Sequence, residues 1–399
     1  MSSWGTTYRF KPFRFEIYSP ENQKWPKGRS GHRIACNERY LYSYGGYNPD
    51  AREDTFFQDP TWFISRPLFK EIWRFNLATH RWKRLPKRRS LPNEMASCAV
   101  VLRGDILIVY GGTGFPFGET CSNKVYLCNV KDGSTKPLPA TGKFPESLYG
   151  IAVVCHGPYL YTVGGTSGYD FHCDIHRIDL RTGVWESVYI CTGADGYEPE
   201  GRYRHELAYD GKRIYVFGGG TTLHSPHFSL QIIPTFDLES NKWMSLATHG
   251  KEDCKYVPAD RLCHSVVQYT DDKTGVTYAV IFGGFNGDEV FRDMWRLDLK
   301  LLQWTCLLRV VDTDPVYFHS ASITPEGCMY SFGGVIRNGH QTRRSDTVLA
   351  VWLKIPKLTE ISWLALNHYC KNLKDMSKSD LLLLGIPLNF VQRLIDDDL

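Results

Sequence analysis

Short runs of apolar and aromatic residues recur along the chain, and six of them end in a pair of glycines. Their length and their content of Tyr, Val, Ile and Phe are typical of buried β-strands. Glycine at a strand end can adopt a positive φ and lets another strand approach closely, because it has no Cβ atom. The pattern therefore predicts six buried strands, at residues 40–44, 105–110, 159–163, 213–217, 278–282 and 328–332, with doublets at 45–46, 111–112, 164–165, 218–219, 283–284 and 333–334.

The doublets recur at intervals of about 50 to 66 residues, a spacing typical of β-propeller blades with loop insertions. In four units the predicted fourth strand opens on a tryptophan, whereas the second unit has Lys136 and Pro137 at that position. A large ring at a repeated buried position would cover apolar area between neighbouring blades. We therefore expect interblade packing by Trp82, Trp185, Trp243 and Trp304.

The two ends of the repeat region predict how the ring closes. The sixth unit has a predicted third strand at residues 347–355 but no fourth strand before the composition becomes helical. Residues 8–18 precede the first unit and are rich in aromatic residues, as a strand would be. Because a free sheet edge promotes association, we expect this N-terminal segment to complete the sixth blade.

The strings Gly28–His32, Arg202–Glu206 and Pro315–His319, together with the doublets, resemble the kelch-repeat family. The resemblance covers residues 29–355 and implies an all-β fold, a six-bladed kelch β-propeller closed by an N-terminal strand. The expected organisation is an N-terminal segment over 1–28, six repeats over 29–355 and a helical module over 356–399.

Charge and hydropathy argue against a nucleic-acid or membrane partner. The net charge is +4 on 399 residues, which does not call for nucleic-acid binding. No apolar run of about 18 residues and no N-terminal signal is present, so we expect a cytoplasmic protein that binds no membrane. One basic run spans residues 81–89; a solvated interblade loop is the favoured interpretation, and a nuclear-import or nucleic-acid patch is the alternative.

Motifs for catalysis or cofactor binding are missing from the sequence. Twelve cysteines occur without a Cys-x-x-Cys pair, so we expect reduced thiols, and the sparse group of His172, Cys173 and His176 predicts no metal site. Glycines at 112, 114 and 118 follow a strand but miss the dinucleotide-binding spacing. No Gly-x-Ser-x-Gly elbow occurs either. We therefore expect a non-catalytic protein without a cofactor.

Arginine and histidine gather at the start of the first strand in three units, the sixth unit has the histidine alone, and the second and third units lack both. In a four-stranded meander these positions share one face, which converges on the axis. A guanidinium binds a carboxylate through two parallel hydrogen bonds, so this asymmetry predicts a carboxylate-binding funnel. Structural ties between blades are the alternative, favoured for the histidines. The expected binding residues are Arg29, Arg202, Arg204, Arg261, His205, His264, His319, Tyr149 and Tyr317, with Tyr203, Phe318 and the loops 47–70 and 220–230 at the rim.

After Pro356 the apolar spacing becomes helical. Apolar, small and apolar residues follow on successive helical turns, which resembles an elongin-binding BC box, and a second pattern downstream resembles a cullin-2 box. In this order after a kelch array, the two resemble a VHL-type box; a hairpin packed under the propeller or a dimerisation element is the alternative. The first pattern consists of Leu358, Ser362 and Leu366, and the second of Ile386, Pro387, Phe390 and Leu394.

These resemblances imply a substrate-recognition subunit of a cullin-2 RING ubiquitin ligase. The implied partners are elongin C and elongin B, cullin-2 with its RING subunit, and the C-termini of substrate proteins, which would end in glycine or in the alanine tails of stalled nascent chains. A pocket too narrow for large side chains fits such termini. The competing hypothesis is a kelch adaptor that binds a signalling enzyme such as a protein phosphatase.

Overall fold

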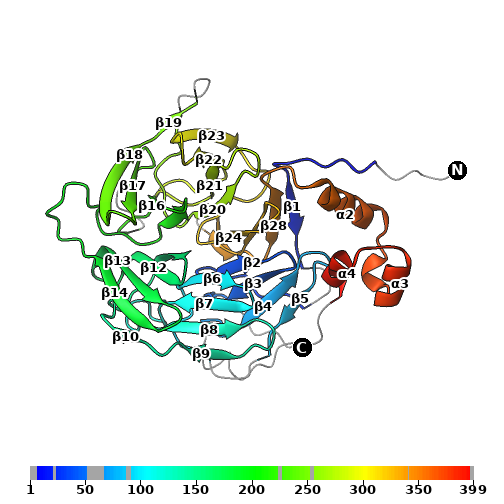
Figure 1. Ribbon diagram of the computed structural model, residues 1–399, viewed down its shortest axis with the longest axis horizontal. Helices are drawn as coiled ribbons and strands as arrows, with labels where there is room; N and C mark the ends of the chain where they lie inside the picture. The colour runs from blue at the N-terminus through cyan, green and yellow to red at the C-terminus, as the bar shows by residue number, and fades with distance from the viewer. Residues whose placement is uncertain are drawn as a thin grey trace.

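The computed structural model consists of six β-sheets arranged around a central axis, with a group of short helices beside the ring (Figure 1). It describes residues 7–20, 24–51, 67–86, 91–222, 227–251, 256–339 and 341–395. Each blade contains an antiparallel four-stranded meander in which the first strand lies innermost. The fold is therefore the six-bladed propeller that the repeats predicted.

The first three blades follow one another along the chain. Blade 1 consists of β2 (Arg33–Cys36), β3 (Tyr40–Tyr44), β4 (Ile72–Asn76) and β5 (Trp82–Arg84). Blade 2 consists of β6 (Ala99–Arg103), β7 (Ile106–Tyr110), β8 (Val125–Asn129) and β9 (Thr135–Pro137). Blade 3 consists of β11 (Ala152–His156), β12 (Tyr159–Thr166), β13 (Phe171–Asp179) and β14 (Val184–Tyr189), with β10 (Thr141–Gly142) added in parallel at its outer edge.

The last three blades complete the ring. Blade 4 consists of β15 (Glu206–Tyr209), β16 (Arg213–Phe217), β17 (Ile232–Asp237) and β18 (Lys242–Ala247). Blade 5 consists of β20 (Ser265–Thr270), β21 (Thr277–Phe282), β22 (Met294–Asp298) and β23 (Gln303–Leu308), with β19 (His249–Gly250) parallel to β23. Blade 6 consists of β24 (Ser320–Ile323), β25 (Cys328–Phe332), β28 (Val348–Trp352) and β1 (Phe15–Tyr18), and the hairpin β26 (Val335–Asn338) and β27 (Gln341–Arg344) extends from it.

The N-terminal strand closes the propeller, as predicted. Strand β1 pairs antiparallel with β28, with Phe15 opposite Val351 and Tyr18 opposite Val348. The outer strand of blade 6 therefore comes from the opposite end of the chain, and it satisfies the sheet edge that the sixth repeat leaves open.

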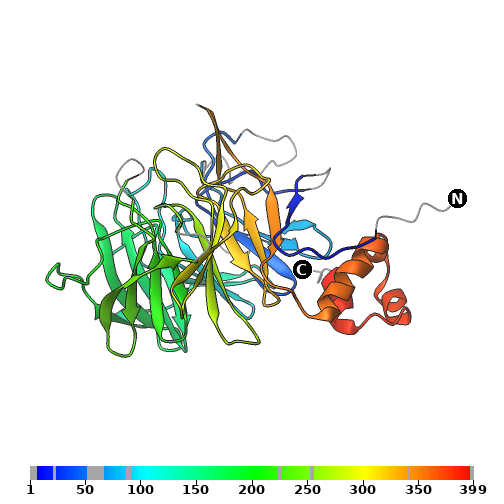
Figure 2. The same cartoon turned by 90° about the horizontal axis from the view of Figure 1, so that it is seen from above.

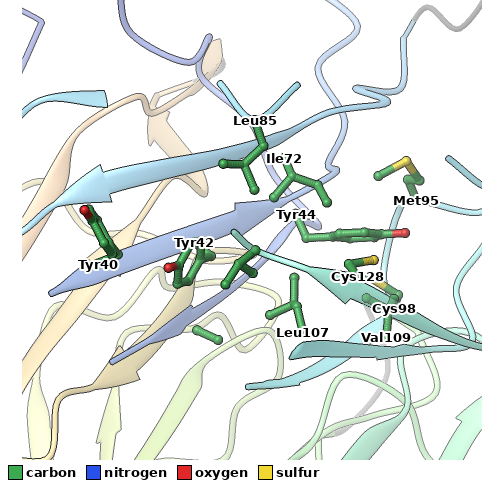
Figure 3. Close-up of a cluster of buried hydrophobic side chains, with 12 residues drawn as sticks. Tyr40, Tyr42, Tyr44, Ile72, Leu85, Met95, Cys98, Leu107, Val109 and Cys128 are labelled. Atoms are coloured by element: carbon green, nitrogen blue, oxygen red, sulfur yellow. The ribbon is translucent and has the colours of Figure 1, made fainter. Parts of the chain in front are cut away.

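Apolar side chains between neighbouring blades form the core. Between blades 1 and 2, the fully buried ring of Tyr44 points toward Cys98 and Cys128 (Figure 3). The four predicted tryptophans are also buried, and Trp82 lies 5.1 Å from Phe332 of blade 6 between ring centroids. The prediction that these indoles pack between blades is confirmed.

The glycine doublets allow the blades to pack this closely. Gly333 has a φ of 67°, and a Cβ atom there would lie 2.4 Å from Cε1 of His32 in the next blade. The second glycine of the doublet, Gly334, has its would-be Cβ 2.8 Å from the Cβ of His319 in its own blade. A side chain at Gly333 would collide with the imidazole of His32, and one at Gly334 with the side chains of Val316 and His319, which explains why the sequence repeats glycine there.

Four short helical segments follow the last blade: α2 (Leu358–Tyr369), η1 (Leu373–Asp375), α3 (Lys378–Leu383) and α4 (Leu388–Leu394). They surround a small apolar core of their own, against which Ala78 of blade 1 also packs. Asn76 and Arg39 donate hydrogen bonds to the carbonyl oxygens of Arg393 and Ile395 at the end of α4, both at 3.1 Å. We call residues 356–395 the helical module; it lies beside blades 1 and 6 at the edge of the ring (Figure 2).

Candidate functional site

Six residues, one from each blade, form a closed ring of main-chain hydrogen bonds around the propeller axis. The N–H of each donates to the carbonyl oxygen of its counterpart in a neighbouring blade at 2.7–3.2 Å, and the sixth bond closes the circle. All six have φ between 55° and 64°, a left-handed conformation that costs roughly 1–2 kcal/mol for each residue other than glycine. We call this set the axial ring: Gly31, Ser97, Gly150, Arg204, Cys263 and Phe318.

Arg204 of the axial ring extends its side chain across the axis. Its Nη2 donates a hydrogen bond to the Ser97 hydroxyl of blade 2, and its Cζ lies 4.5 Å from the ring centroid of Phe318 in blade 6. Its Nε is buried without a hydrogen-bond partner, and no carboxylate of a described residue is within ion-pair distance. Burial lowers the pKa of Arg204, but a guanidinium stays charged at neutral pH. Arg204 therefore supplies an uncompensated cation at the axis.

An ion pair lies beneath the axial ring. Arg33 and Glu206, each two residues further along an inner strand, bridge blades 1 and 4 with 2.5 Å between Nη1 and Oε1. The Nε of Arg33 also donates to the carbonyl oxygen of Cys98 at 3.1 Å. Both side chains line a channel cavity of about 300 Å³ between the inner strands. We call the face of the propeller that carries the axial ring the ring face. A ligand that enters the channel from this face would meet Arg204 first and the neutralised Arg33–Glu206 ion pair behind it.

The structure corrects the prediction that Arg29, Arg202 and Arg261 line this funnel. All three are buried between strands of their own blades. In each, Nε donates to the carbonyl oxygen two residues earlier, and Nη1 donates to the carbonyl oxygen of the first glycine of the blade's doublet. Each guanidinium also stacks on an aromatic ring, at 3.8–4.2 Å from the centroids of Phe69, Phe228 and Phe291. These repeated contacts make the three arginines structural.

Arg202 differs from the other two in its charge partner. Glu71 and Asp293 each contact the corresponding arginine, Arg29 and Arg261, at 2.6 Å. In blade 4 the equivalent position, two residues after the stacked phenylalanine, is occupied by Leu230. Among the residues that the structure describes, no carboxylate pairs with Arg202, and burial lowers its pKa to about 10.

The histidines lie between blades, which agrees with the structural role that the sequence favoured for them and not with substrate binding. His205, His264 and His319 are almost fully buried. Burial lowers the pKa of His205 and His319 to about 3 and lowers that of His264 well below its usual value, so all three are neutral. Each imidazole packs on the first glycine of the preceding blade's doublet: Gly164, Gly218 and Gly283.

Aromatic side chains surround Arg204 on the ring face, where the sequence placed them. Tyr149 and Tyr203 contact each other edge to face at 6.3 Å, and Tyr317 lies 5.4 Å from Phe318. All four rings are partly exposed. Of the nine predicted binding residues, only Arg204, Tyr149 and Tyr317 reach this face. The predicted rim loops lie partly outside the described residues, which include 47–51, 67–70, 220–222 and 227–230.

Sequence reasoning missed several residues of the ring face. Ser97 belongs to a unit without the arginine and histidine and is not among the predicted binding residues, yet its hydroxyl accepts a hydrogen bond from the guanidinium of Arg204. Tyr47 stacks on Phe115 at 5.6 Å and contacts Phe117 at 4.9 Å, which adds a second exposed aromatic cluster. The sequence holds a signal that could have identified Ser97: it occupies the same position of its unit as Arg204, two residues before the first strand.

The helical module exposes some of the predicted box residues and buries others. Leu358 is 76% exposed, and Ser362 lies one turn further along the same helix, also exposed. Leu366 and Phe390 are partly buried in the module, and Phe390 stacks on Trp363 at 5.0 Å. Ile386 and Leu394 belong to the module's own core, whereas Pro387 is exposed at the start of α4. Further exposed leucines lie on α3 and beside it: Leu382, Leu383 and Leu384.

The remaining predictions concern charge, metals and membranes. Arg81 and Arg84 of the basic run pair with Asp375 and Glu71, but residues 87–90 lie outside the described part of the chain. Within the described ranges, no cluster of three or more His, Cys, Asp or Glu side chains could hold a metal ion. None of the described helices is long and apolar enough to cross a bilayer.

Comparisons with known proteins agree on the repeats. The family model described as KLHDC2/KLHL20/DRC7 Kelch-repeats domain matches residues 6–219, 62–273 and 191–362. Kelch domain-containing protein 10 of Homo sapiens is 40% identical over 92% of this chain and 80% of that protein. The Kelch domain-containing protein 10 homolog of Drosophila melanogaster is 39% identical over 97% of this chain, which spans 66% of that relative. Kelch domain-containing protein 2 of Bos taurus is 24% identical over 87% of this chain.

Proposed function

This chain belongs to the kelch-repeat family and is a relative of kelch domain-containing protein 10; from that premise we propose that it is the substrate-recognition subunit of a cullin-2 RING ubiquitin ligase. The propeller binds the extreme C-terminus of a substrate protein on the ring face. The helical module binds elongin C, with elongin B, and cullin-2. The protein itself performs no chemistry, and it acts where its substrates are, in the cytoplasm, with the nucleus as an alternative.

The position of Arg204 is the observation that carries the substrate half of this proposal. A C-terminal carboxylate is an anion at the end of a chain, and it can pair with a guanidinium through charge-assisted hydrogen bonds. Arg204 offers a buried Nε without a partner, next to the hydroxyl of Ser97. Because low-dielectric surroundings strengthen such bonds, one cation at this place can anchor a chain terminus.

The closed axis explains why a chain end fits better than an internal loop. The axial ring encircles the channel and the Arg204 side chain extends across it, so a bound polypeptide cannot continue through it. Tyr149, Tyr203, Tyr317 and Phe318 restrict the space around the guanidinium. A terminal glycine or alanine leaves room there, whereas a large last side chain would meet these rings.

The placement of the helical module supports the ligase half. The axial ring precedes the inner strands, whereas the module contacts Arg39, Asn76 and Ala78 at the turns on the other side of blade 1. A substrate on the ring face would therefore leave the module accessible. The exposed side chains of Leu358, Leu383 and Leu384 are apolar and cost free energy in water, so they suit a protein partner.

Peptide binding tests the substrate half. The full chain is titrated with fluorescent decapeptides that end in glycine or alanine, as free acids and as C-terminal amides. We expect binding of the acids and a loss of affinity on amidation, because the amide removes the charge that Arg204 would contact. Equal affinity of acid and amide would disprove the carboxylate site.

Co-purification with elongin C tests the ligase half. Leu358→Asp is the better probe because this side chain is exposed, whereas Leu366 also supports the core of the module. We expect Leu358→Asp to abolish co-purification, and Ile232→Asp, an exposed apolar residue of blade 4, to leave it intact. Retention of elongin C by Leu358→Asp would contradict the ligase assignment and favour the adaptor hypothesis, in which a signalling enzyme such as a phosphatase binds the ring face.

A further inference from the structure

We propose that Cys173 and Cys191 in blade 3 are a redox modification site, at which hydrogen peroxide converts two thiols into a reversible disulfide. The proposal does not depend on the proposed function, because it concerns two strands at the outer part of a blade. Both cysteines are reduced in the structure.

The strand register places the two cysteines opposite each other. Strands β13 and β14 pair antiparallel, with Ile175 opposite Tyr189. Cys173 lies two residues before Ile175 in β13, and Cys191 lies two residues after Tyr189, just beyond the end of β14, so continuation of this register brings the two cysteines opposite each other on one face. Directly opposed Cα atoms in an antiparallel pair lie about 4.5–5.5 Å apart, within the range that a disulfide spans. A hydrogen bond from Cys191 N–H to the Asp174 carboxylate, 2.8 Å long, holds the segment after β14 in place.

The two sulfur atoms already interact. Cys191 is in hydrogen-bond contact with Cys173, which together with burial raises the pKa of the Cys191 thiol. Because the Cys191 thiol holds its proton more firmly than a free thiol, we assign Cys173 as the sulfur that attacks first. Cys191 is partly exposed, so a small oxidant can approach the pair from solvent.

Arg202 supplies the charge that this chemistry needs. It is the one of the three repeated arginines for which the described residues offer no carboxylate. The N–H of Arg202 donates to the carbonyl oxygen of His172, the residue before Cys173, at 3.0 Å. A guanidinium next to a cysteine stabilises the thiolate, which is the reactive form. Leu230, in place of an acid, thus leaves Arg202 available to Cys173.

The reaction balances with peroxide as the oxidant. The Cys173 thiolate attacks one peroxide oxygen, the S–O bond forms, the O–O bond breaks, and the leaving hydroxide takes a proton to become water. The Cys191 sulfur then attacks the sulfenic sulfur of Cys173, the S–S bond forms, and the second hydroxide leaves as water with the Cys191 proton. Two thiols lose two electrons in total, and one peroxide becomes two waters.

Peptide mapping tests the proposal on the full chain. The reduced protein is treated with hydrogen peroxide, alkylated and digested without reductant. We expect a linked peptide that contains Cys173 and Cys191, two hydrogens lighter than its reduced parts, and we expect dithiothreitol to reverse it. In Cys191→Ser we expect no link and a Cys173 sulfenic acid that dimedone traps. Cys155→Ser, which removes a partly exposed cysteine of β11, is the matched control and should form the link at the wild-type rate.

The role of Arg202 has its own variants. We expect Arg202→Met to slow disulfide formation about tenfold, since one nearby cation changes the thiolate population by roughly that factor, and Arg202→Lys to stay close to wild type. A thermal melt shows whether Arg202→Met is folded, and Arg202→Lys keeps the test valid if it is not. Absence of the linked peptide, or a Cys191→Ser protein without a trappable Cys173, would overturn the proposal.

Discussion

The guanidinium of Arg204 in blade 4 donates a hydrogen bond to the hydroxyl of Ser97 in blade 2, across the axis of the propeller. This contact is possible because both residues belong to the axial ring and share a left-handed backbone, with φ of 57° and 58°. Their side chains therefore leave the inner strands at the same height and meet over the channel. A cation is held at the centre of one face by a residue from a different repeat.

The first prediction concerns Arg204→Asn. Asparagine tolerates the left-handed backbone, so the variant should keep the axial ring while it removes the charge. A hydrogen bond to a charged group contributes about 1.5–3 kcal/mol, so we expect a loss of affinity for C-terminal peptides of roughly 10- to 150-fold. Isothermal titration calorimetry measures it.

Two further variants complete this test. Arg204→Lys keeps the charge without the planar fork and should bind with intermediate affinity. Arg103→Gln removes an exposed arginine at the far end of β6, away from the axial ring, and should bind like wild type. Unchanged affinity in Arg204→Asn would show that the peptide carboxylate is held elsewhere.

A second prediction isolates the steric role of the doublets. In Gly333→Ala the new Cβ atom would lie 2.4 Å from Cε1 of His32, and the blade interface must shift. We expect a loss of about 2–4 kcal/mol in the free energy of unfolding, from overpacking and the left-handed backbone together. Gly157→Ala is the matched control: its φ is 55°, but nothing lies within 4 Å of the new Cβ.

Urea unfolding of both glycine variants separates the two contributions. Gly157→Ala should cost only the backbone part, about 1–2 kcal/mol. If both variants lose the same stability, the packing of His32 on the doublet contributes nothing, and the interblade explanation for the repeated glycines is wrong.

Buried arginines lead to a third prediction. Arg261→Met leaves the Asp293 carboxylate in a largely buried position without its cation, so we expect about 3–5 kcal/mol of destabilisation. Arg202→Met leaves no carboxylate of a described residue without its cation, so we expect a clearly smaller loss in the free energy of unfolding than for Arg261→Met. Guanidinium chloride unfolding compares the two. An equal loss in both would mean that stacking on Phe291 and Phe228, and not the ion pair, is what stabilises these sites.

The repeats made the fold predictable, because a doublet, a strand pattern and a tryptophan recur at fixed places and each repetition supports the others. The axial site was less predictable, since Arg202 and Arg204 are only two residues apart. Sequence alone does not reveal that the left-handed backbone at 204 sends one side chain to the axis, while Arg202 turns into its own blade.

In the helical module, too, the sequence predicts the element but not which of its side chains are exposed. A pattern of apolar residues three and four apart marks a helix, but it does not say which apolar residues face the module's own core. Leu358 is exposed, whereas Ile386 and Leu394, from a pattern of the same kind, are buried against Trp363 and Val391. Tertiary packing within the module decides which apolar side chains are exposed for binding and which support the module's core, and the sequence pattern does not contain that information.

The last prediction concerns pH. Burial holds the pKa of His205 at about 3, well below the value of about 6.5 that an unfolded chain would have. Between these values the unfolded state binds a proton that the native state does not, so stability is full above about pH 6.5 and falls as the pH drops toward 3. At about 1.4 kcal/mol per pH unit, the protonation of this one histidine should lower the free energy of unfolding by about 2 kcal/mol between pH 7 and pH 5.

Urea unfolding of His205→Gln at both pH values should show a loss of stability that is smaller than that of wild type by this amount. His249→Gln, at an exposed position, should lose as much as wild type. If His205→Gln shows the same pH dependence as wild type, His205 is already protonated between the blades, and its assignment as a neutral spacer is wrong.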